Sequence, residues 1–221
     1  MSARSPWPRR FLAGAAWIVG ARVKVEGTPL AARSLVLANH SSWLDILVLA
    51  SATGTRFVSK AEIATAPLIG WLAEQHHTLY IDRAERGDAY GQIRRISEAL
   101  ADPLPLAIFP EGTTGGGRAL LPFRSTLLKA VAPPPPGTQV RPVAIDYHDA
   151  IDSIAWTGGE PGLANALRVL GMPGARKVTI RLLDPVAPTA DRKTLARHAA
   201  QAIATALSSV IQPDALEAQP R

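Results

Sequence analysis

The segment Leu35–Ala50, which reads LVLANHSSWLDILVLA, determines the fold expected for this chain. Its first four residues form a short apolar run of the length and branching typical of a buried strand. The apolar run that begins at Trp43 is long enough to be a helix rather than a second strand. His40 therefore lies in the turn between a strand and a helix, which is where α/β proteins usually carry their functional groups.

The same segment brings a histidine close to a carboxylate. Ser42 is a suitable N-cap for the helix, and Asp45 follows three residues later, as the acid of a capping box does. A carboxylate that accepts the Nδ1 proton of His40 leaves Nε2 free to take a proton from a substrate hydroxyl. This predicts a general-base dyad without a protein nucleophile. The alternative is that Asp45 only caps its own helix and His40 is an ordinary loop residue.

The composition limits the classes of function. The chain has 221 residues, 47% of them hydrophobic, which suits one domain with an ample core. It has no cysteine, so disulfides, thiolate metal sites and a cysteine nucleophile are excluded. The net charge of +6 indicates an anionic partner, such as a membrane surface, nucleic acid or a CoA-type substrate. We expect no nucleic acid, because clustered arginines with interleaved aromatics are missing beyond the N-terminus, and no metal.

Residues 1–22 are expected to form a basic, amphipathic membrane-anchoring segment. The first 25 residues carry five basic side chains and no acid. The apolar run Phe11–Gly20 is only half of the roughly 20 residues that a bilayer-spanning helix needs. Arginines beside Trp7 and Trp17 favour a helix that lies in the headgroup region of an anionic membrane. A plainly packed helix and a secretory signal are the alternatives.

Strands and helices alternate along the rest of the chain. This pattern predicts an α/β fold with a largely parallel or mixed central sheet flanked by helices, preceded by the N-terminal membrane-interface helix. We expect one catalytic domain at 23–212 and a disordered tail at 213–221. The expected strands are Val23–Val25, Leu35–Ala38, Arg56–Ser59, Thr78–Ile81, Pro105–Phe109, Val140–Ile145 and Lys177–Leu183. The expected helices after the first are Trp43–Ala50, Pro67–Gln75, Asp88–Leu100, Pro122–Val131 and Asp191–Ile211.

Polar residues follow three of these strands, at Asn39-His40, Asp82-Arg83 and Glu111–Thr113. The carboxyl ends of parallel strands face the same crevice, so we expect the three segments to converge. Arg83 and nearby Lys60 would hold an anionic headgroup, and Glu111 would orient a polyol or an amine. In the alternative interpretation Arg83 pairs with a neighbouring acid and Glu111 simply sits in a turn. The glycine-rich stretch 112–118 lacks the ending of a phosphate-binding P-loop and is expected to be a flexible loop over the site.

Five segments resemble the ordered sequence blocks of the glycerolipid acyltransferase family, which includes the bacterial 1-acylglycerol-3-phosphate acyltransferases. They are Asn39–Asp45 (NHSSWLD), Phe57–Lys60 (FVSK), Ile81–Arg83 (IDR), Phe109–Thr113 (FPEGT) and Arg141–Ile145 (RPVAI). One such block would carry little weight, but five in the same order at family-like spacing are highly specific. The resemblance covers most of the chain, roughly residues 23–186.

The resemblance implies an O-acyltransferase with His40 and Asp45 as the catalytic pair. His40 would deprotonate the hydroxyl of a lysolipid acceptor, which attacks an acyl thioester and releases CoA or acyl carrier protein. Acyl-CoA or acyl-ACP is then a co-substrate, and no cofactor is implied. The family also implies peripheral or monotopic attachment to the cytoplasmic face of the inner membrane. The positions that match acceptor-binding blocks are Lys60, Arg83, Glu111, Gly112 and Thr113.

One departure from the family pattern concerns the acceptor. Members that act on lysophosphatidate usually continue Glu-Gly-Thr with an arginine, taken to hold the acceptor phosphate, where this chain has Thr114. A planar bidentate anion clamp is thereby lost, unless Arg118 or Arg124 replaces it. The sequence here also resembles a bacterial branch that includes lyso-ornithine lipid acyltransferases. We expect 1-acyl-sn-glycerol-3-phosphate as acceptor, giving phosphatidate, with lyso-ornithine lipid as the alternative.

Two other classes of function remain open at the level of the sequence. One is a non-catalytic lipid-binding protein with this fold, which the joint presence of His40, Asp45, Arg83 and Glu111 disfavours. The other is a thioesterase, in which His40 activates water instead of a lipid hydroxyl. A site closed against water by docking to a membrane would disfavour the thioesterase.

Overall fold

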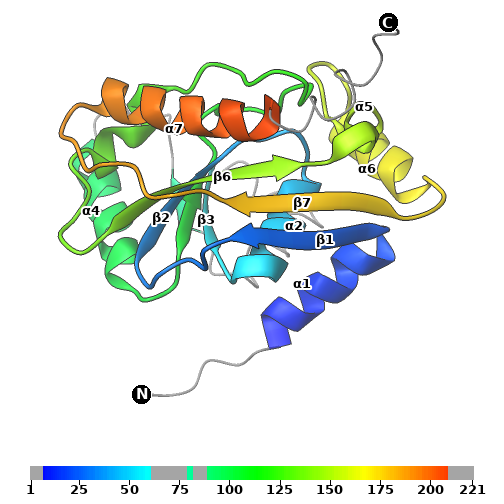
Figure 1. The fold of residues 1–221 in the computed structure, drawn as a ribbon, viewed down its shortest axis with the longest axis horizontal. Coiled ribbons are helices and arrows are strands. Elements are labelled where there is room, and N and C mark those ends of the chain that lie inside the picture. Colours follow the sequence, from blue (N-terminus) through cyan, green and yellow to red (C-terminus); the bar gives the residue numbers. More distant parts are fainter. Residues whose placement is uncertain (1–6, 61–78, 82–88, 209–221) are drawn as a thin grey trace, which may run out of the picture.

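The computed structural model describes residues 7–60, 79–81 and 89–208, and across them the chain forms one seven-stranded mixed sheet (Figure 1). The strands are β1 (Ala21–Gly27), β2 (Ser34–Ala38), β3 (Arg56–Lys60), β4 (Leu79–Ile81), β5 (Leu106–Ile108), β6 (Gln139–Asp146) and β7 (Arg176–Leu182). Their order in the sheet is β1-β7-β6-β2-β5-β3-β4. All neighbours are parallel except β6 and β7, so β1 and β7 run against the other five strands.

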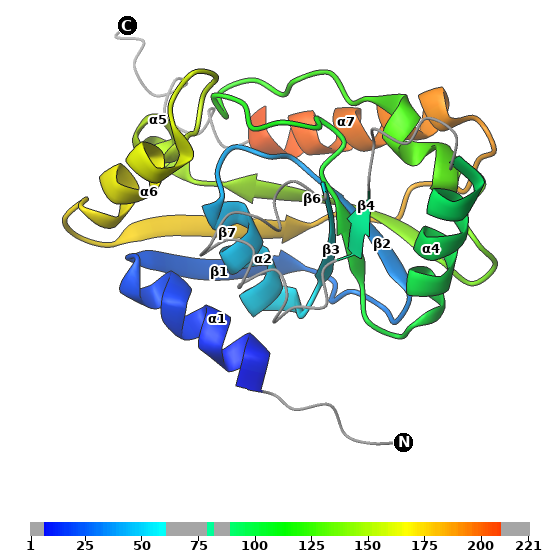
Figure 2. The same cartoon turned by 180° about the vertical axis from the view of Figure 1, so that it is seen from behind.

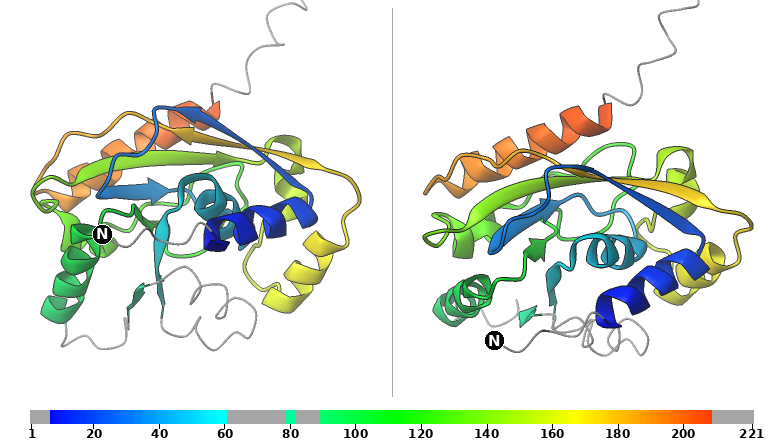
Figure 3. Two further views of the ribbon diagram at one scale, coloured as in Figure 1. Left: turned by 90° about the horizontal axis from the view of Figure 1, so that it is seen from below. Right: turned by 60° about the horizontal axis from the view of Figure 1, so that its bottom comes forward.

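Helices cover both faces of this sheet, as the views from the two sides show (Figures 1 and 2). The helices on the face that carries the active-site turn are α1 (Trp7–Ile18), α2 (Leu44–Thr53), α5 (Ile151–Ile154) and α6 (Gly162–Leu170). The other face is covered by α4 (Ala89–Ala101), the 3₁₀ helix η2 (Ser125–Val131) and α7 (Arg192–Ser208). Figure 3 shows the sheet between α7 on one side and α1 and α2 on the other.

Strand β2 is the centre of the molecule, because both of its faces are buried. Val36 and Ala38 belong to the core beneath α1 and α2, and Leu35 and Leu37 belong to the core beneath α4 and α7. All four side chains are fully buried. A parallel strand covered on both sides needs a continuous apolar run rather than an alternating one, which is why this segment was recognisable in the sequence.

The predicted fold class is confirmed, and each predicted strand has a counterpart within about two residues at either end. The segment 122–131 was expected to be an ordinary helix, but the structure has a 3₁₀ helix that starts only at Ser125. Helix α6 was not predicted, because Gly158, Gly159 and Pro161 mark turns and hid the short apolar repeat that follows. Helix α5, which is only four residues long, was not predicted either. The predicted helix 67–75 and the tail 213–221 lie outside the described residues.

Helix α1 is a packed helix that also exposes apolar side chains. Leu12 and Ala16 are buried in the core, whereas Trp17 and Ile18 are 62% and 77% exposed. The guanidinium of Arg9 donates to the carbonyl oxygen of Ser51 at 2.8 Å and so fixes α1 to the end of α2. The segment therefore combines a buried face with an exposed aromatic and aliphatic face. Among the helices of the described ranges, none has the length and apolar character needed to cross a bilayer.

Candidate active site

Asn39, the first residue after β2, fixes the turn that follows to the neighbouring strand β6. Its side-chain nitrogen donates to the carbonyl oxygen of Ile145 at 2.9 Å, and its side-chain oxygen accepts from the backbone nitrogen of the same residue at 2.8 Å. Asn39 is buried, and these two hydrogen bonds use its amide as both donor and acceptor at one strand edge. The turn therefore leaves the sheet at a defined point, at the carboxyl ends of β2 and β6.

The predicted contact between His40 and Asp45 is present in the structure. His40 Nδ1 lies 2.8 Å from Asp45 Oδ2, and the same oxygen accepts from the backbone nitrogens of Ser41 at 2.7 Å and Ser42 at 2.9 Å. Asp45 thus reaches back over the start of α2 as expected, although the helix begins at Leu44, one residue later than the sequence suggested. A carboxylate in this position favours the His40 tautomer that carries its proton on Nδ1.

Tyr147 holds the other oxygen of the Asp45 carboxylate. Its hydroxyl donates to Oδ1 at 2.6 Å, and both side chains are buried. Burial, together with the charge and the hydrogen bond of Asp45, raises the pKa of Tyr147 well above its usual value of 10.0. The hydroxyl therefore remains protonated and keeps donating to the carboxylate. With three donors at Oδ2 and this one at Oδ1, the buried charge of Asp45 is well compensated.

The imidazole of His40 is held in place by aromatic stacking. The centroid of its ring lies 4.1 Å from the centroid of the Phe109 ring, and the two ring planes make an angle of 14°. Phe109 stacks in turn on Phe57. The His40 side chain is 17% exposed. Within the described part of the chain, His40 Nε2 has no hydrogen-bond partner. A fixed ring with Nδ1 bound to a carboxylate and Nε2 open is suited to accept a proton from an incoming hydroxyl.

Glu111 holds the turn from the direction of β5. Its Oε1 accepts from the backbone nitrogen of His40 at 2.7 Å, and its Oε2 accepts from the backbone nitrogen of Leu121 at 2.9 Å. Burial raises the pKa of Glu111 above its usual value, while the two amide hydrogen bonds act in the opposite direction. The side chain is 3% exposed and therefore joins parts of the protein to each other. The contact predicted between Glu111 and a polyol or amine of the substrate stays a prediction, because both carboxylate oxygens are bound to backbone nitrogens of the protein.

The loop 112–118, which was expected to be flexible, is hydrogen-bonded to its surroundings at two residues. Gly115 donates its backbone N–H to the carbonyl oxygen of His40 at 2.9 Å. The hydroxyl of Thr114 donates to the carbonyl oxygen of Trp156 at 2.6 Å. Because Gly116 and Gly117 have no side chain, the loop backbone can lie close to Thr157 and Ile151, which follow β6 in the sequence. The loop therefore forms a wall of the site.

The two arginines considered as replacements for the missing phosphate clamp lie in this loop or just after it. Arg118 forms a two-point ion pair with Asp152, with Nε 2.8 Å from Oδ1. Both partners are largely exposed, and such surface pairs are weak. Arg124 is exposed, and in the part of the chain that is described its guanidinium has no partner. Among the described contacts, neither guanidinium is bound to the residues around His40.

The remaining predicted positions are only partly described. Gly112 and Thr113 form the turn directly after Glu111, where Gly112 has a φ of 74° that favours glycine and Thr113 is exposed. Lys60 is the last residue of β3, so its backbone lies at the same sheet edge as the ends of β2 and β5. The side chain of Lys60 and the whole of Arg83 lie outside what is described. Their predicted roles remain untested.

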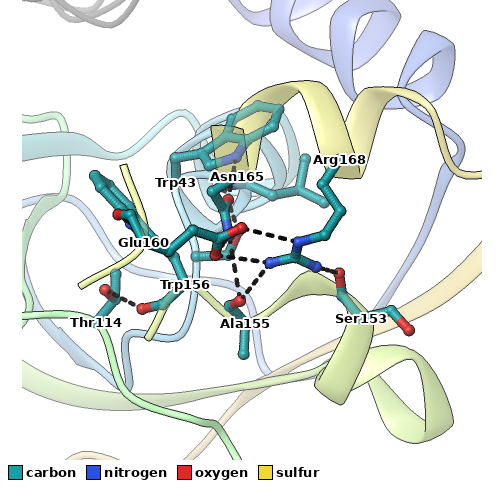
Figure 4. A network of polar contacts seen from close by, with 10 residues as sticks. Trp43, Thr114, Ser153, Ala155, Trp156, Glu160, Asn165 and Arg168 are labelled. Carbon is teal, nitrogen blue, oxygen red and sulfur yellow. Dashed lines mark hydrogen bonds and ion pairs between the residues drawn. The ribbon is translucent and has the colours of Figure 1, made fainter. Parts of the chain in front are cut away.

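A polar network that the sequence did not reveal connects the turn to α6 (Figure 4). The indole nitrogen of Trp43 donates to Asn165 Oδ1 at 3.0 Å, and Asn165 Nδ2 donates to Glu160 Oε2 at 2.8 Å. Arg168 binds Glu160 with two nitrogens, each at 2.9 Å from a carboxylate oxygen, and lowers the pKa of that carboxyl. The indole of Trp156 donates to the Glu160 carbonyl oxygen at 2.8 Å. The network fixes α6 relative to the residues that carry the site.

Sequence reasoning missed Tyr147, the partner of Asp45. A signal was available, because Tyr147 follows directly after β6 and the carboxyl ends of parallel neighbours meet at one edge. The five sequence blocks drew attention to 141–145 and stopped two residues short. Asn39 and Thr114 were singled out in the sequence but their hydrogen-bond partners were not, and Asn165 had no signal beyond its residue type.

Comparisons with known proteins agree with this geometry. A family model described as Acyltransferase matches residues 22–146. A lyso-ornithine lipid O-acyltransferase of Pseudomonas aeruginosa is 39% identical over 194 residues, which is 86% of this chain and 74% of that protein. One of Brucella abortus is 32% identical over 94% of this chain and 85% of that protein. A 1-acyl-sn-glycerol-3-phosphate acyltransferase of Neisseria meningitidis serogroup B is 32% identical over 67% of this chain and 57% of that protein.

A solved structure shares the fold. The crystal structure of the 1-acyl-sn-glycerophosphate acyltransferase PlsC from Thermotoga maritima matches with a TM-score of 0.70, over 93% of this chain and 79% of that one, at 21% sequence identity. At this identity the match shows the fold alone. The family model, however, covers more than half of the chain, and the relatives align along most of it. The resemblance seen in the sequence is thereby confirmed: this chain belongs to the acyltransferase family and is an acyltransferase.

Proposed function

We propose that this chain moves a fatty acyl group from an acyl thioester to the hydroxyl of a lysolipid, with His40 as the general base. The observation that carries the proposal is the imidazole with Nδ1 bound to buried Asp45 and Nε2 open. Nε2 takes the proton of the acceptor hydroxyl while its oxygen attacks the thioester carbonyl carbon. The carbon–sulfur bond then breaks, and the imidazolium returns the proton to the departing thiolate. Asp45 stabilises the imidazolium in between.

The donor in this proposal is acyl-CoA or acyl-ACP, and no further cofactor takes part. The step moves one proton and one acyl group, so it needs neither an electron acceptor nor a metal. The turn after β5 and the end of β3 lie at the sheet edge that carries His40, which supports an acceptor site there. The residues proposed to contact the acceptor are Lys60, Arg83, Gly112 and Thr113.

Lyso-ornithine lipid is the acceptor that the observations favour, which reverses the order expected from the sequence. The relatives with that name align over 86% and 94% of this chain. Thr114 stands where an arginine would bind a phosphomonoester, and its hydroxyl is already used by Trp156. A phosphomonoester carries a charge of about −1.5 to −2 at neutral pH. An ornithine headgroup carries both an ammonium and a carboxylate, and it does not require a dedicated arginine clamp.

1-Acyl-sn-glycerol-3-phosphate is the second candidate, with phosphatidate as its product. It is favoured by the Neisseria relative of that name and by Arg118. Because the pair between Arg118 and Asp152 is exposed, it can open at little cost and release a guanidinium for a phosphate. Both acceptors are lipids, so we propose peripheral or monotopic association with an anionic membrane, on the cytoplasmic face of the inner membrane where the thioester donors are found.

The test is acyl transfer by the purified full chain in mixed micelles. Acyl-CoA and acyl-ACP are supplied as donors, and lyso-ornithine lipid and 1-acyl-sn-glycerol-3-phosphate as parallel acceptors. His40→Ala is the inactive variant, and His198→Ala is its matched control, because His198 is an exposed histidine on α7, on the opposite face of the sheet. We expect faster transfer to lyso-ornithine lipid, loss of transfer in His40→Ala and unchanged transfer in His198→Ala.

Other outcomes would change the assignment. Faster transfer to 1-acyl-sn-glycerol-3-phosphate, together with a loss in Arg118→Ala, would establish the second acceptor. Release of free fatty acid without an acceptor, at the rate of ester formation with one, would indicate a thioesterase. Transfer by His40→Ala at the rate of the unchanged chain would remove His40 from the mechanism.

A further inference from the structure

Helix α6 turns its leucines outward. Leu163, Leu167 and Leu170 recur at spacings of four and three residues and are 74%, 61% and 49% exposed, so they form one continuous face. The buried residues of this helix are Asn165 and Val169. A helix on the surface of a soluble domain normally buries such a leucine stripe, and an exposed one marks a contact with another apolar phase or partner.

The end of α6 lies beside the end of α1 (Figure 3). α1 leads into β1 and α6 leads into β7, and these strands are parallel neighbours with Ala21 opposite Arg176. The guanidinium of Arg176 bridges the two helix ends, donating to the carbonyl oxygens of Val19 and Met172 at 2.6 Å each. The exposed Trp17, near the end of α1, and the exposed Leu170, the last residue of α6, therefore lie at neighbouring helix ends.

The segments that form these two helices and the starts of the strands after them carry basic residues, while Glu160, just before α6, is bound to Arg168. No acidic residue occurs in 161–183, and none occurs in the first 25 residues. Arg22, which lies over the ring of Trp17 at 4.7 Å, and Lys177 on β7 are exposed basic residues of these segments. Exposed leucines and tryptophan flanked by cations are the chemistry of a surface that binds an anionic lipid interface.

The position of α6 is coupled to the active site. The hydrogen bond from Trp43 to Asn165 joins it to the turn that carries His40. The Glu160 and Trp156 contacts extend to Thr114 in the loop that forms the wall of the site. A bilayer that holds the leucine face would thus hold the reactive imidazole at a fixed height above the lipid.

We infer that the leucine face of α6, Leu163, Leu167 and Leu170, docks into the headgroup region of an anionic phospholipid bilayer next to α1. The proposal rests on the proposed function in that a lipid acceptor must reach His40 from a membrane. Its occupant is the bilayer, because the exposed cations Arg22 and Lys177 beside exposed Trp17 and the leucines match an anionic interface. Covering by a second copy of the chain would be the competing explanation.

The experiment uses the absence of cysteine in this chain. Leu167→Cys in the full chain carries an environment-sensitive fluorophore, and Gln201→Cys on α7, at an exposed position on the opposite face, carries the same fluorophore as a control. Both are mixed with vesicles of phosphatidylglycerol and phosphatidylcholine that contain a nitroxide-labelled lipid. We expect strong quenching at position 167 and little at position 201, and little at either with phosphatidylcholine alone.

Affinity gives a second measurement. Leu163→Gln with Leu167→Gln is expected to weaken sedimentation with the anionic vesicles about tenfold or more, from the apolar area that no longer enters the lipid. Val25→Gln changes an exposed apolar residue in the second half of β1, away from the α1 end, and is expected to bind as the unchanged chain does. All substitutions are at exposed positions, so the thermal unfolding midpoint should not move.

Three results would overturn the inference. The first is equal quenching at positions 167 and 201 on vesicle-bound protein. The second is an unchanged vesicle affinity of the double glutamine variant. The third is a dimer, seen in sedimentation velocity, that shields position 167 when no vesicles are present. A failure of the proposed function can be distinguished from a failure of this inference, because fluorescence quenching does not require the chain to turn over substrate. Acyl transfer to a lysolipid with a short acyl chain, supplied below its critical micelle concentration so that no lipid surface is present, should be equal in the double variant and the unchanged chain.

Discussion

Tyr147 and Asp45 are joined by a buried hydrogen bond of 2.6 Å across 102 residues of sequence. It connects the end of β6 to the first turn of α2 and takes the carboxylate oxygen that His40 does not use. The carboxylate is thereby fixed from both sides. The orientation of the His40 ring consequently depends on the packing of β6 as well as on the local turn.

Replacing Asp45 with Asn should lower turnover by about two to four orders of magnitude, as in related histidine–aspartate systems. An Asn oxygen can still face the three donors at Oδ2 and its nitrogen can face Tyr147, so the fold should persist. The loss then reflects the missing negative charge next to the imidazolium. Steady-state acyl transfer, with thermal unfolding as a control, measures this. A reduction of less than tenfold would remove Asp45 from the mechanism.

Tyr147→Phe should reduce turnover by about three- to thirtyfold with little change in the KM for the donor, because one of the hydrogen bonds that fix Asp45 is lost. The carboxylate retains its contacts at Oδ2, so the effect should be smaller than that of Asp45→Asn. Kinetics of both variants, alone and combined, test the order. If the tyrosine acts only through Asp45, Tyr147→Phe should add nothing to Asp45→Asn.

Glu111→Gln should change how stability depends on pH. Because the folded pKa of Glu111 is raised, the unfolded chain loses this proton at a lower pH than the folded chain does. The free energy of unfolding of the protein with Glu111 therefore falls as pH rises from the usual pKa of a glutamate to the raised pKa in the folded chain. Glutamine does not titrate, so Glu111→Gln lacks this loss. The stability of the unchanged chain relative to Glu111→Gln should fall over this window.

Urea unfolding of both proteins between about pH 4 and 8 measures the difference. At all pH values Glu111→Gln should also cost about 1–3 kcal/mol, because its amide nitrogen faces a backbone N–H that has lost its acceptor. A relative stability that rises with pH would mean that the two amide hydrogen bonds outweigh burial and lower the pKa instead.

Gly117→Ala should destabilise the protein by about 1–3 kcal/mol and reduce activity. Gly117 has a φ of 77°, and a Cβ there would clash with Ile151 Cδ1 and lie 3.0 Å from Ser41 Oγ. Gly116→Ala is the matched control, because its nearest neighbour would be Thr157 at 3.9 Å. It should stay within about 0.5 kcal/mol of the unchanged chain. Equal unfolding midpoints for the two variants would contradict the close packing of this loop.

The sequence was sufficient where contacts are local. The apolar run of β2, the helix that follows and the pairing of His40 with Asp45 all lie within one stretch of sixteen residues. Strand propensity, helix length and the reach of a side chain over a helix start decide these features, and none of them requires knowledge of the rest of the chain.

The tertiary structure decided which distant groups complete the site. Tyr147 reaches Asp45, and Glu111 reaches the backbone of His40, because strand order places β6 and β5 on either side of β2. The hydrogen bond of Thr114 and the outward leucines of α6 depend in the same way on how loops close over the sheet. Residue types and spacing do not specify these contacts, since pairing between remote segments is set by the packing of whole elements and not by local preference.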